Sequence, residues 1–310
     1  METEKKILDI EDRNEVFKTI SGKIELLNKA FRALSMDYSY HIETTFGKDH
    51  KIFDIKKDIE YRLFSSKFHL ELLFRQHLVI QDRIEKIYKT EPKKIIGEVY
   101  PSNPIFDYCE KEISSILDSI IFHLASVYDY VSSIINFICN KKSETISKWS
   151  QLNSSCLDKK NVFHSKKIAE TIREQHNLFV NKLYSHRSRL IHKTSDIHPL
   201  SLSIKLKSGK TNVKFFATKE LTKNFSELKK LSRTNKITIE YVAKWFIDNT
   251  FSSLFKIMHS LKDEMEAMST FPHHVKDDEI VMVYRNPKTG IGEPSSVPIW
   301  ESIKADINYS

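Results

Sequence analysis

Glycine and proline are scarce in this sequence, which has 6 glycines and 8 prolines among 310 residues. These two residues are the strongest local interruptions of regular structure. Four of the prolines and two of the glycines fall after residue 270, so the preceding chain contains still fewer interruptions. The composition therefore leaves room for long, uninterrupted helices.

Cysteine is also rare, and its three copies, Cys109, Cys139 and Cys156, lie far apart in the sequence. Their odd number argues against a disulfide framework, and their spacing does not match a zinc site. Cys109 and Cys139 fall within an apolar helical pattern, which predicts buried thiols. Such cysteine usage is typical of a protein from the reducing cytoplasm.

The sequence lacks the common motifs of cofactor-dependent and metal-dependent enzymes. It contains no phosphate-binding glycine loop, dinucleotide fingerprint, HExxH helix or CxxC pair, and no nucleophile elbow. His273 and His274 are adjacent, but no third metal ligand accompanies them. We therefore predict neither a metal ion nor a cofactor.

A secretory or membrane-spanning segment is not expected either. The N-terminal segment METEKKILDIEDRNE is charged and lacks the apolar core of a signal peptide. The most apolar stretch runs from Ile113 to Ile138, and Asp118, His123 and Asp129 interrupt it. Because ionisable side chains are costly inside a bilayer, we predict a soluble cytoplasmic protein that does not contact a membrane.

What the sequence does contain is an ordinary globular composition with an excess of positive charge. Hydrophobic residues make up 40% of the chain and aromatic residues 11%, which is too many for a disordered protein. The formal net charge is +8. A basic surface attracts phosphate polymers, so RNA is a natural partner to expect, although lysines also serve solubility.

Apolar residues recur at helical spacing over five long stretches, and this periodicity predicts a mainly α-helical protein. The expected helices cover residues 12–36, 53–90, 104–140, 165–194 and 238–268. A short helix is expected around Trp149 and Leu152. Apolar and polar residues alternate on both sides of Ser208-Gly209, which predicts a β-hairpin near residues 201–217, and the segment EIVMVY predicts a short strand. We therefore expect a helical bundle with a small β-hairpin insertion and extra N-terminal helices.

Pro92, Pro101 and Pro104 interrupt the helical pattern and mark an expected internal boundary. We predict an N-terminal helical region at 1–95 that packs on the core, a helical bundle at 96–270, and a tail containing proline and glycine at 271–310.

The stretch 104–140 has two different faces. One face carries a continuous stripe of apolar residues: Cys109, Ile113, Leu117, Ile120, Leu124, Val127, Val131, Ile134 and Ile138. The opposite face includes Asp118 and Asp129, which align because eleven residues span about three helical turns. That face is either bare solvent surface or a second contact surface that lets another backbone approach closely.

The best candidate functional residues lie in the segment KLYSHRSRLIHK at 182–193. Arg187 can bind a phosphate through two parallel hydrogen bonds, and His192 is the type of side chain that exchanges protons near neutral pH. RNA cleavage by its own 2′-hydroxyl needs proton transfer at oxygen and stabilisation of the charge on phosphorus. The pair therefore favours metal-independent chemistry on RNA.

This Arg-x4-His pattern at the end of a long helix, with a polar residue after the arginine, resembles the motif of the HEPN superfamily. The resemblance covers about residues 103–268 and implies a compact helical bundle that is frequently dimeric. Many members are metal-independent ribonucleases of toxin–antitoxin, phage-defence and RNA-processing systems. The resemblance implies that Arg187 binds the phosphate and His192 transfers protons. Ser188 would occupy the polar position, where the family commonly has Asn, Asp or His, and the hairpin resembles an insertion carried by some branches.

Neighbouring side chains extend this candidate site. His186, Arg189 and Lys193 would bind the RNA backbone, while Asp118 or Asp129 would orient Arg187 through a bidentate ion pair. Each group also has a simpler interpretation. Basic residues and histidines are favoured at helix C-termini in any case, and the two aspartates fit a solvated helix face.

Two further observations bear on the motif. A second match, Arg62 with His69, lies in the middle of an apolar helix and is the poorer candidate. On an ideal helix, Arg187 and His192 are about 140° apart around the axis, so they do not share one narrow face. Two copies of the motif facing each other would solve this, which predicts a homodimer with both motifs at its interface.

The leading functional hypothesis is therefore a metal-independent endoribonuclease of the HEPN type, acting as a toxin or phage-defence effector with RNA as substrate and an antitoxin or regulatory protein as partner. Its products would carry a 2′,3′-cyclic phosphate and a 5′-hydroxyl. The alternative is a non-catalytic RNA-binding or protein-interaction module that has the fold without the chemistry.

Overall fold

The structure is a computed structural model of the chain. It describes residues 5–42, 51–96, 103–140, 146–192, 195–205, 210–269, 282–285, 292–295, 299–301 and 303. Lys193, the hairpin turn at Ser208-Gly209 and the pair His273-His274 lie outside the described residues.

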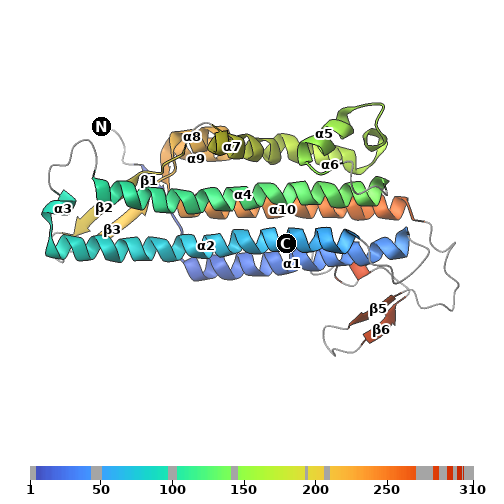
Figure 1. The fold of residues 1–310 in the computed structure, drawn as a ribbon, viewed down its shortest axis with the longest axis horizontal. Coiled ribbons are helices and arrows are strands. Elements are labelled where there is room, and N and C mark those ends of the chain that lie inside the picture. The colour runs from blue at the N-terminus through green and yellow to red at the C-terminus, as the bar shows by residue number, and fades with distance from the viewer. Residues whose placement is uncertain are drawn as a thin grey trace. The chain divides into compact units, whose positions relative to one another are not determined.

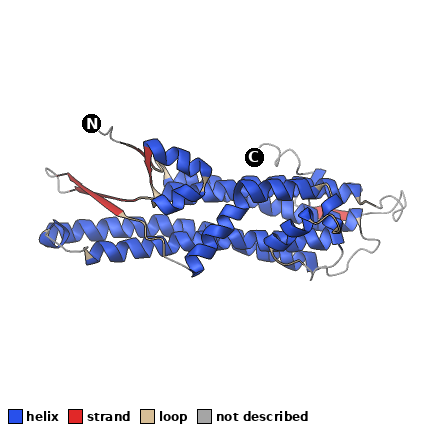
Figure 2. Ribbon diagram, turned by 90° about the horizontal axis from the view of Figure 1, so that it is seen from above, coloured by secondary structure: helices blue, strands red, loops and turns tan. Residues whose placement is uncertain are grey.

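Helices make up most of the described chain, as Figures 1 and 2 show. The long helices are α1 (Arg13–His41), α2 (Lys51–Thr90), α4 (Pro104–Asn140) and α10 (Ile239–Ala267). The shorter helices are α3 (Lys93–Ile96), α5 (Trp149–Leu157), α6 (Ile168–Gln175), α7 (Asn181–His192), α8 (Lys219–Asn224) and α9 (Ser226–Thr234). A 3-10 turn at Val162–Ser165 precedes α6, and a π-helical turn at His176–Val180 joins α6 to α7. The predicted mainly α-helical fold is confirmed.

The strands within the described residues are short and pair in twos. The predicted hairpin is confirmed: β2 (Leu200–Lys205) pairs antiparallel with β3 (Lys210–Phe215). The segment EIVMVY overlaps β5 (Met282–Arg285), which pairs antiparallel with β6 (Gly292–Ser295). No pattern in the sequence indicated the remaining pair, in which β1 (Lys6–Leu8) runs parallel to β4 (Asn235–Ile237).

Packing divides the chain into two compact units, each built from three separate segments. The first unit comprises Met1–Ile20, Phe64–Ala125 and Phe179–Asn249, and the second comprises Ser21–Leu63, Ser126–Leu178 and Thr250–Ser310. Each of the four long helices contributes residues to both units. This division runs differently from the three consecutive regions expected from the sequence, which remain a prediction.

The first unit has an aromatic core and a buried ion cluster. The rings of Phe225 and Phe246 pack edge to face with centroids 4.9 Å apart, and Trp245 packs against both. Glu240, only 2% exposed, binds Arg13 at 2.9 Å and His77 at 2.7 Å. A buried carboxylate with such partners holds the start of α1 and the middle of α2 against α10.

In the second unit, helix α5 and a short part of the C-terminal region pack on the long helices. The Trp149 ring packs edge to face on Tyr128 of α4, with centroids 5.3 Å apart. Asp37 of α1 accepts the backbone N–H groups of Ile299 and Trp300 at 2.6 and 2.8 Å. Trp300 is 1% exposed, so this part of the region 271–310 is docked in the core.

The expected apolar stripes are largely buried. All nine stripe residues of α4 are at most 1% exposed, and the thiols of Cys109 and Cys139 are buried as predicted. Leu78 of α2 is an exception and is 52% exposed, because the apolar set of α2 is wider than the face that the core covers. By length and composition alone α4 could cross a membrane, but 61% of its most apolar window is buried inside the protein, and the core helix of a soluble protein passes the same test.

Candidate functional site

The Arg-x4-His motif lies on α7, in the first unit. Arg187 is half-buried in the middle of the helix, and His192 is exposed as its last residue. The helix remains regular between them, so the ideal turn of about 100° per residue applies and the two side chains point about 140° apart. Within one chain, Arg187 and His192 therefore do not converge on one narrow face.

Three hydrogen bonds position α7 and the segment that follows it along α4. The Tyr184 hydroxyl donates to the Ala125 carbonyl at 3.0 Å, the His198 N–H donates to the Ser114 hydroxyl at 2.9 Å, and the Leu200 N–H donates to a Glu110 carboxylate oxygen at 2.7 Å. The two segments thus run in opposite directions. Because Ala125 is fully buried, the second face of α4 is a contact surface at this point rather than bare solvent surface.

Asp118 lies between these anchors, opposite the C-terminal part of α7. Burial raises the pKa of Asp118 to about 6, and the nearby Asp196 carboxylate adds to this effect. One of its carboxyl oxygens is buried and has no hydrogen-bond partner within the described part of the chain. A carboxyl group with a raised pKa beside a basic helix is typical of functional sites.

Asp129, in contrast, belongs to the second unit. Trp149 is the first residue of α5, and its backbone N–H donates to the Asp129 carboxylate at 3.1 Å. A carboxylate at a helix N-terminus satisfies an otherwise unpaired donor and favours the helix dipole. Of the two aspartates predicted to orient Arg187, only Asp118 shares a unit with it.

Arg189 is the centre of an ion cluster at the end of α7. Its guanidinium lies 3.2 Å from Asp196, 2.9 Å from Glu220 on α8 and 3.1 Å from Nδ1 of His186. His186 is only 1% exposed. These contacts hold α7 to the following loop and to α8, so the predicted phosphate-binding role of Arg189 and His186 would require this cluster to rearrange, and it remains a prediction.

Two buried histidines of this cluster are uncharged at neutral pH. Burial, followed by the Arg189 charge, lowers the pKa of His186 to about 4. Burial also lowers the pKa of His198 to about 4, although Asp196 opposes the shift. Nδ1 of His198 accepts the backbone N–H of Thr218 at 3.3 Å, which is the arrangement of a structural histidine.

Sequence reasoning missed Asp196 and His198. Both are buried, and they follow the motif helix within the segment Asp-Ile-His-Pro. Two ionisable residues in so short a connection between a helix and a strand were the available signal. Ser188 is exposed on α7, its predicted role stays a prediction, and Lys193 lies outside the described residues. In the second match to the motif, Arg62 with His69, the histidine lies in the middle of α2 and its Nδ1 donates to the Ser65 carbonyl at 2.7 Å.

The described residues contain no group of three or more His, Cys, Asp or Glu side chains placed to hold a metal ion. Comparisons of the sequence and of the structure with known proteins found no matching family model, no matching curated protein and no matching solved structure. Functional inference therefore rests on the residues themselves.

Proposed function

We propose that the protein is a metal-independent endoribonuclease of the HEPN type, in which Arg187 binds the scissile phosphate and His192 transfers protons. The supporting observation is the difference in solvent exposure among the three histidines within and just after α7. His186 and His198 are each 1% exposed, whereas His192 stands open to solvent at the end of α7. A histidine must reach the substrate to act as a general acid or base.

The proposed reaction needs no co-reactant. The RNA 2′-hydroxyl attacks the adjacent phosphorus, so a new P–O2′ bond forms while the P–O5′ bond breaks. One proton leaves the 2′-oxygen to a general base, and one proton is supplied to the departing 5′-oxygen by a general acid. The guanidinium of Arg187 would stabilise the negative charge that develops on the phosphate oxygens. The products carry a 2′,3′-cyclic phosphate and a 5′-hydroxyl.

The regular geometry of α7 leaves Arg187 and His192 of one chain about 140° apart, so a single chain does not present both groups to one phosphate. A second copy of the chain would bring a second motif to the same phosphate. We therefore propose that the active unit is a homodimer. Asp118, opposite the end of α7, would act as a positioning residue for this helix.

A second candidate function is RNA binding without cleavage. The observation that favours it is the same separation of about 140° between Arg187 and His192, which leaves a single chain without a converged pair. In that case binding would weaken steeply with salt, because the release of counterions dominates such affinity.

The test is incubation of total RNA with the purified protein in EDTA, beside its Arg187→Ala/His192→Ala variant. Arg32→Ala serves as a control, because Arg32 is an exposed arginine of the second unit. We expect cleavage by the unmodified protein and by the control, loss of cleavage in the double variant, and products whose 5′-hydroxyl accepts a kinase label directly. Products with a 5′-phosphate would exclude the mechanism, and binding without cleavage would establish the second candidate.

A further inference from the structure

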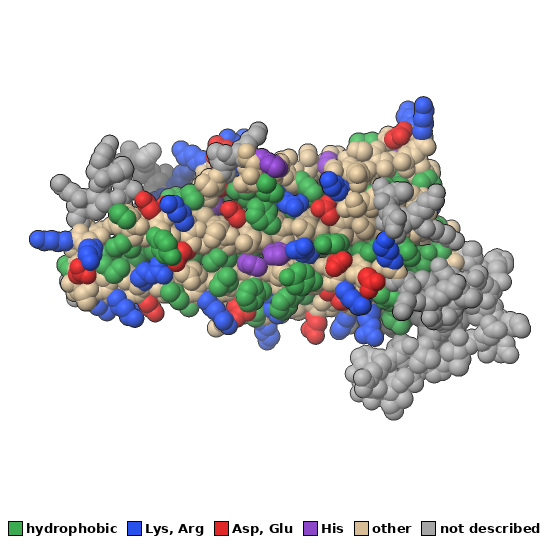
Figure 3. Space-filling view, in the orientation of Figure 1, with side chains coloured by type: hydrophobic (Ala, Val, Ile, Leu, Met, Phe, Trp, Pro, Cys, Tyr) green, Lys and Arg blue, Asp and Glu red, His purple; other side chains and the backbone are tan. Residues whose placement is uncertain are grey.

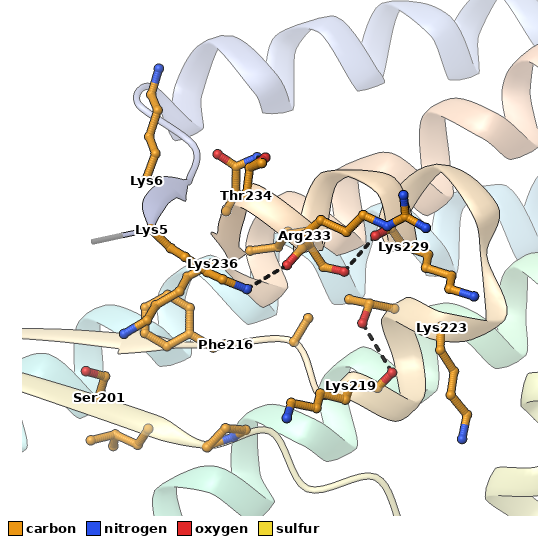
Figure 4. A pocket seen from close by; sticks show the side chains of 17 residues that line it. Lys5, Lys6, Ser201, Phe216, Lys219, Lys223, Lys229, Arg233, Thr234 and Lys236 are labelled. Carbon is orange, nitrogen blue, oxygen red and sulfur yellow. Dashed lines mark hydrogen bonds between the residues drawn. The ribbon is translucent and has the colours of Figure 1, made fainter. Parts of the chain in front are cut away.

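A large basic cleft lies in the first unit, apart from the Arg187 motif. Strands β1 and β4, the start of β2 and helices α8 and α9 form its walls, and its volume is about 1410 Å³. Figure 4 shows the side chains that line it. Small-molecule pockets usually measure about 300 to 1,000 Å³, so this cleft has room for a segment of a larger ligand.

Positive charge dominates this cleft. Seven of its lining residues are cationic: Lys5, Lys6, Lys219, Lys223, Lys229, Arg233 and Lys236. None of its lining residues is an aspartate or glutamate. On the face drawn in Figure 3, by contrast, lysine and arginine side chains are interspersed with carboxylates. The cleft therefore differs in charge from the ordinary surface of this protein.

Few of these cations have a carboxylate partner. Lys223 binds Glu220 on the same short helix, and Lys5 donates to the Ser232 carbonyl at 3.0 Å. Within the described residues the other cations of the cleft form no ion pair. Like charges gathered in one concavity repel one another and focus a positive potential, and a polyanionic ligand would remove that repulsion.

An aromatic ring accompanies the cations. Phe216 is half-buried in the cleft wall, and the amino group of Lys236 lies 5.7 Å from the centre of its ring. Figure 4 shows Lys236 beside this ring. A cationic groove with an aromatic platform is the combination by which proteins bind single-stranded nucleic acid, because cations hold the backbone and bases stack on the ring.

We propose that this cleft binds the phosphate backbone of single-stranded RNA, with one base stacked on Phe216. The concave shape favours a flexible strand over a membrane, because a bilayer surface does not enter a cleft between strands and helices. The proposal concerns binding alone and does not depend on cleavage at Arg187 and His192.

The test uses fluorescence anisotropy with a labelled oligouridine of about 16 nucleotides, a length that spans such a site. All proteins carry Arg187→Ala/His192→Ala, so the probe stays intact and any contribution of those residues is constant. The cleft variant adds Lys219→Gln, Lys229→Gln and Arg233→Gln, all at exposed positions. The matched control instead adds Lys18→Gln, Lys86→Gln and Lys93→Gln, which remove the same charge from exposed positions of the same unit outside the cleft.

We expect the cleft variant to bind at least about tenfold more weakly at low salt. The slope of the logarithm of the binding constant against the logarithm of the salt concentration should be shallower by about 2, since each phosphate contact to a single strand contributes about 0.7. The control should keep the affinity and slope of its parent. Equal binding by the cleft variant and the control, or no binding by the parent, would overturn the proposal. Binding to phosphatidylserine vesicles in place of RNA would overturn it in favour of a membrane surface.

A further variant tests the stacking platform. Phe216→Leu keeps an apolar side chain in the wall but removes the aromatic face, and we expect RNA binding to weaken at least about fivefold. An unchanged thermal unfolding midpoint would show that the fold is intact. Unchanged affinity, or equal affinity for an RNA duplex whose bases are already stacked, would refute the stacking contact.

Discussion

Mixing two inactive variants tests the proposed sharing of the site between two chains. Arg187→Ala removes the proposed phosphate-binding group, and His192→Ala removes the proposed proton-transfer group. Each variant alone should be inactive in either arrangement of the site. If the active site combines Arg187 of one chain with His192 of another, a mixed dimer contains one site in which both residues are intact.

The size of the recovery follows from the geometry of α7. The separation of about 140° between Arg187 and His192 means that one chain does not supply a converged pair. When equal amounts of the two variants exchange freely, about half of the symmetric dimers become mixed, and each mixed dimer has one complete site of two. The expected activity is therefore about a quarter of that of the unmodified protein.

The assay is RNA cleavage in EDTA after the two variants have been unfolded and refolded together, with separately refolded variants as the control. Recovery close to one quarter would show that the site is shared. Absence of recovery, with mixed dimers demonstrated by two distinguishable affinity tags, would show that Arg187 and His192 act within one chain. That outcome would refute the geometric reasoning.

Two buried carboxyl groups give further predictions for stability. Burial raises the pKa of Asp118 to about 6 in the folded protein, whereas its pKa in the unfolded chain is lower. The free energy of unfolding therefore falls as the pH rises from the unfolded-state pKa to the folded-state pKa. Relative to the unmodified protein, Asp118→Asn should gain about 1 to 2 kcal/mol of unfolding free energy between about pH 4 and pH 7.5, after allowance for partial exposure; urea unfolding with no such gain would contradict this. Burial raises the pKa of Asp37 to about 7 despite two N–H donors, and Asp37→Asn should gain up to about 4 kcal/mol over the same range. If the free energy of unfolding, measured with urea, changed with pH in the same way for Asp37→Asn and the unmodified protein, ionisation of this carboxyl would not destabilise the fold.

The long helices could be predicted because each has an apolar face that repeats with the helical period. The expected stretch 104–140 matches α4 at both ends, since Pro104 begins it and the stripe from Cys109 to Ile138 is buried along one side. Such a stripe is a local pattern that one segment of sequence carries by itself. The periodicity therefore located the core helices before any contact was known.

Features that depend on distant partners could not be predicted in this way. Lys6 of β1 pairs with Asn235 of β4, more than two hundred residues away, and each strand is only three residues long. The expected single helix at 165–194 instead contains the π-helical turn His176–Val180. A strand of three residues is too short to show the alternation of apolar and polar residues that marks a strand. A π-helical turn is set by packing rather than by a distinctive composition.

The same distinction applies to the candidate site. The spacing of Arg187 and His192 is visible in the sequence, whereas the burial of His186 and the contacts of Arg189 with Asp196 and Glu220 are tertiary properties. The basic cleft was represented in the sequence only by the net charge of +8. Its cations come from segments as distant as β1 and α9, so only folding brings them together.

Helix α8 connects the motif helix with the basic cleft. Its Glu220 binds Arg189 of α7, while Lys219 and Lys223 on the same helix line the cleft. By helical geometry His192 lies about 60° around α7 from Arg189, and Arg187 lies about 160° from it. His192 is therefore on the side of α7 that faces α8, and Arg187 is on the other side. An RNA strand leaving the cleft along α8 would meet His192 before Arg187 of the same chain, which agrees with a site in which a second copy supplies the phosphate-binding arginine.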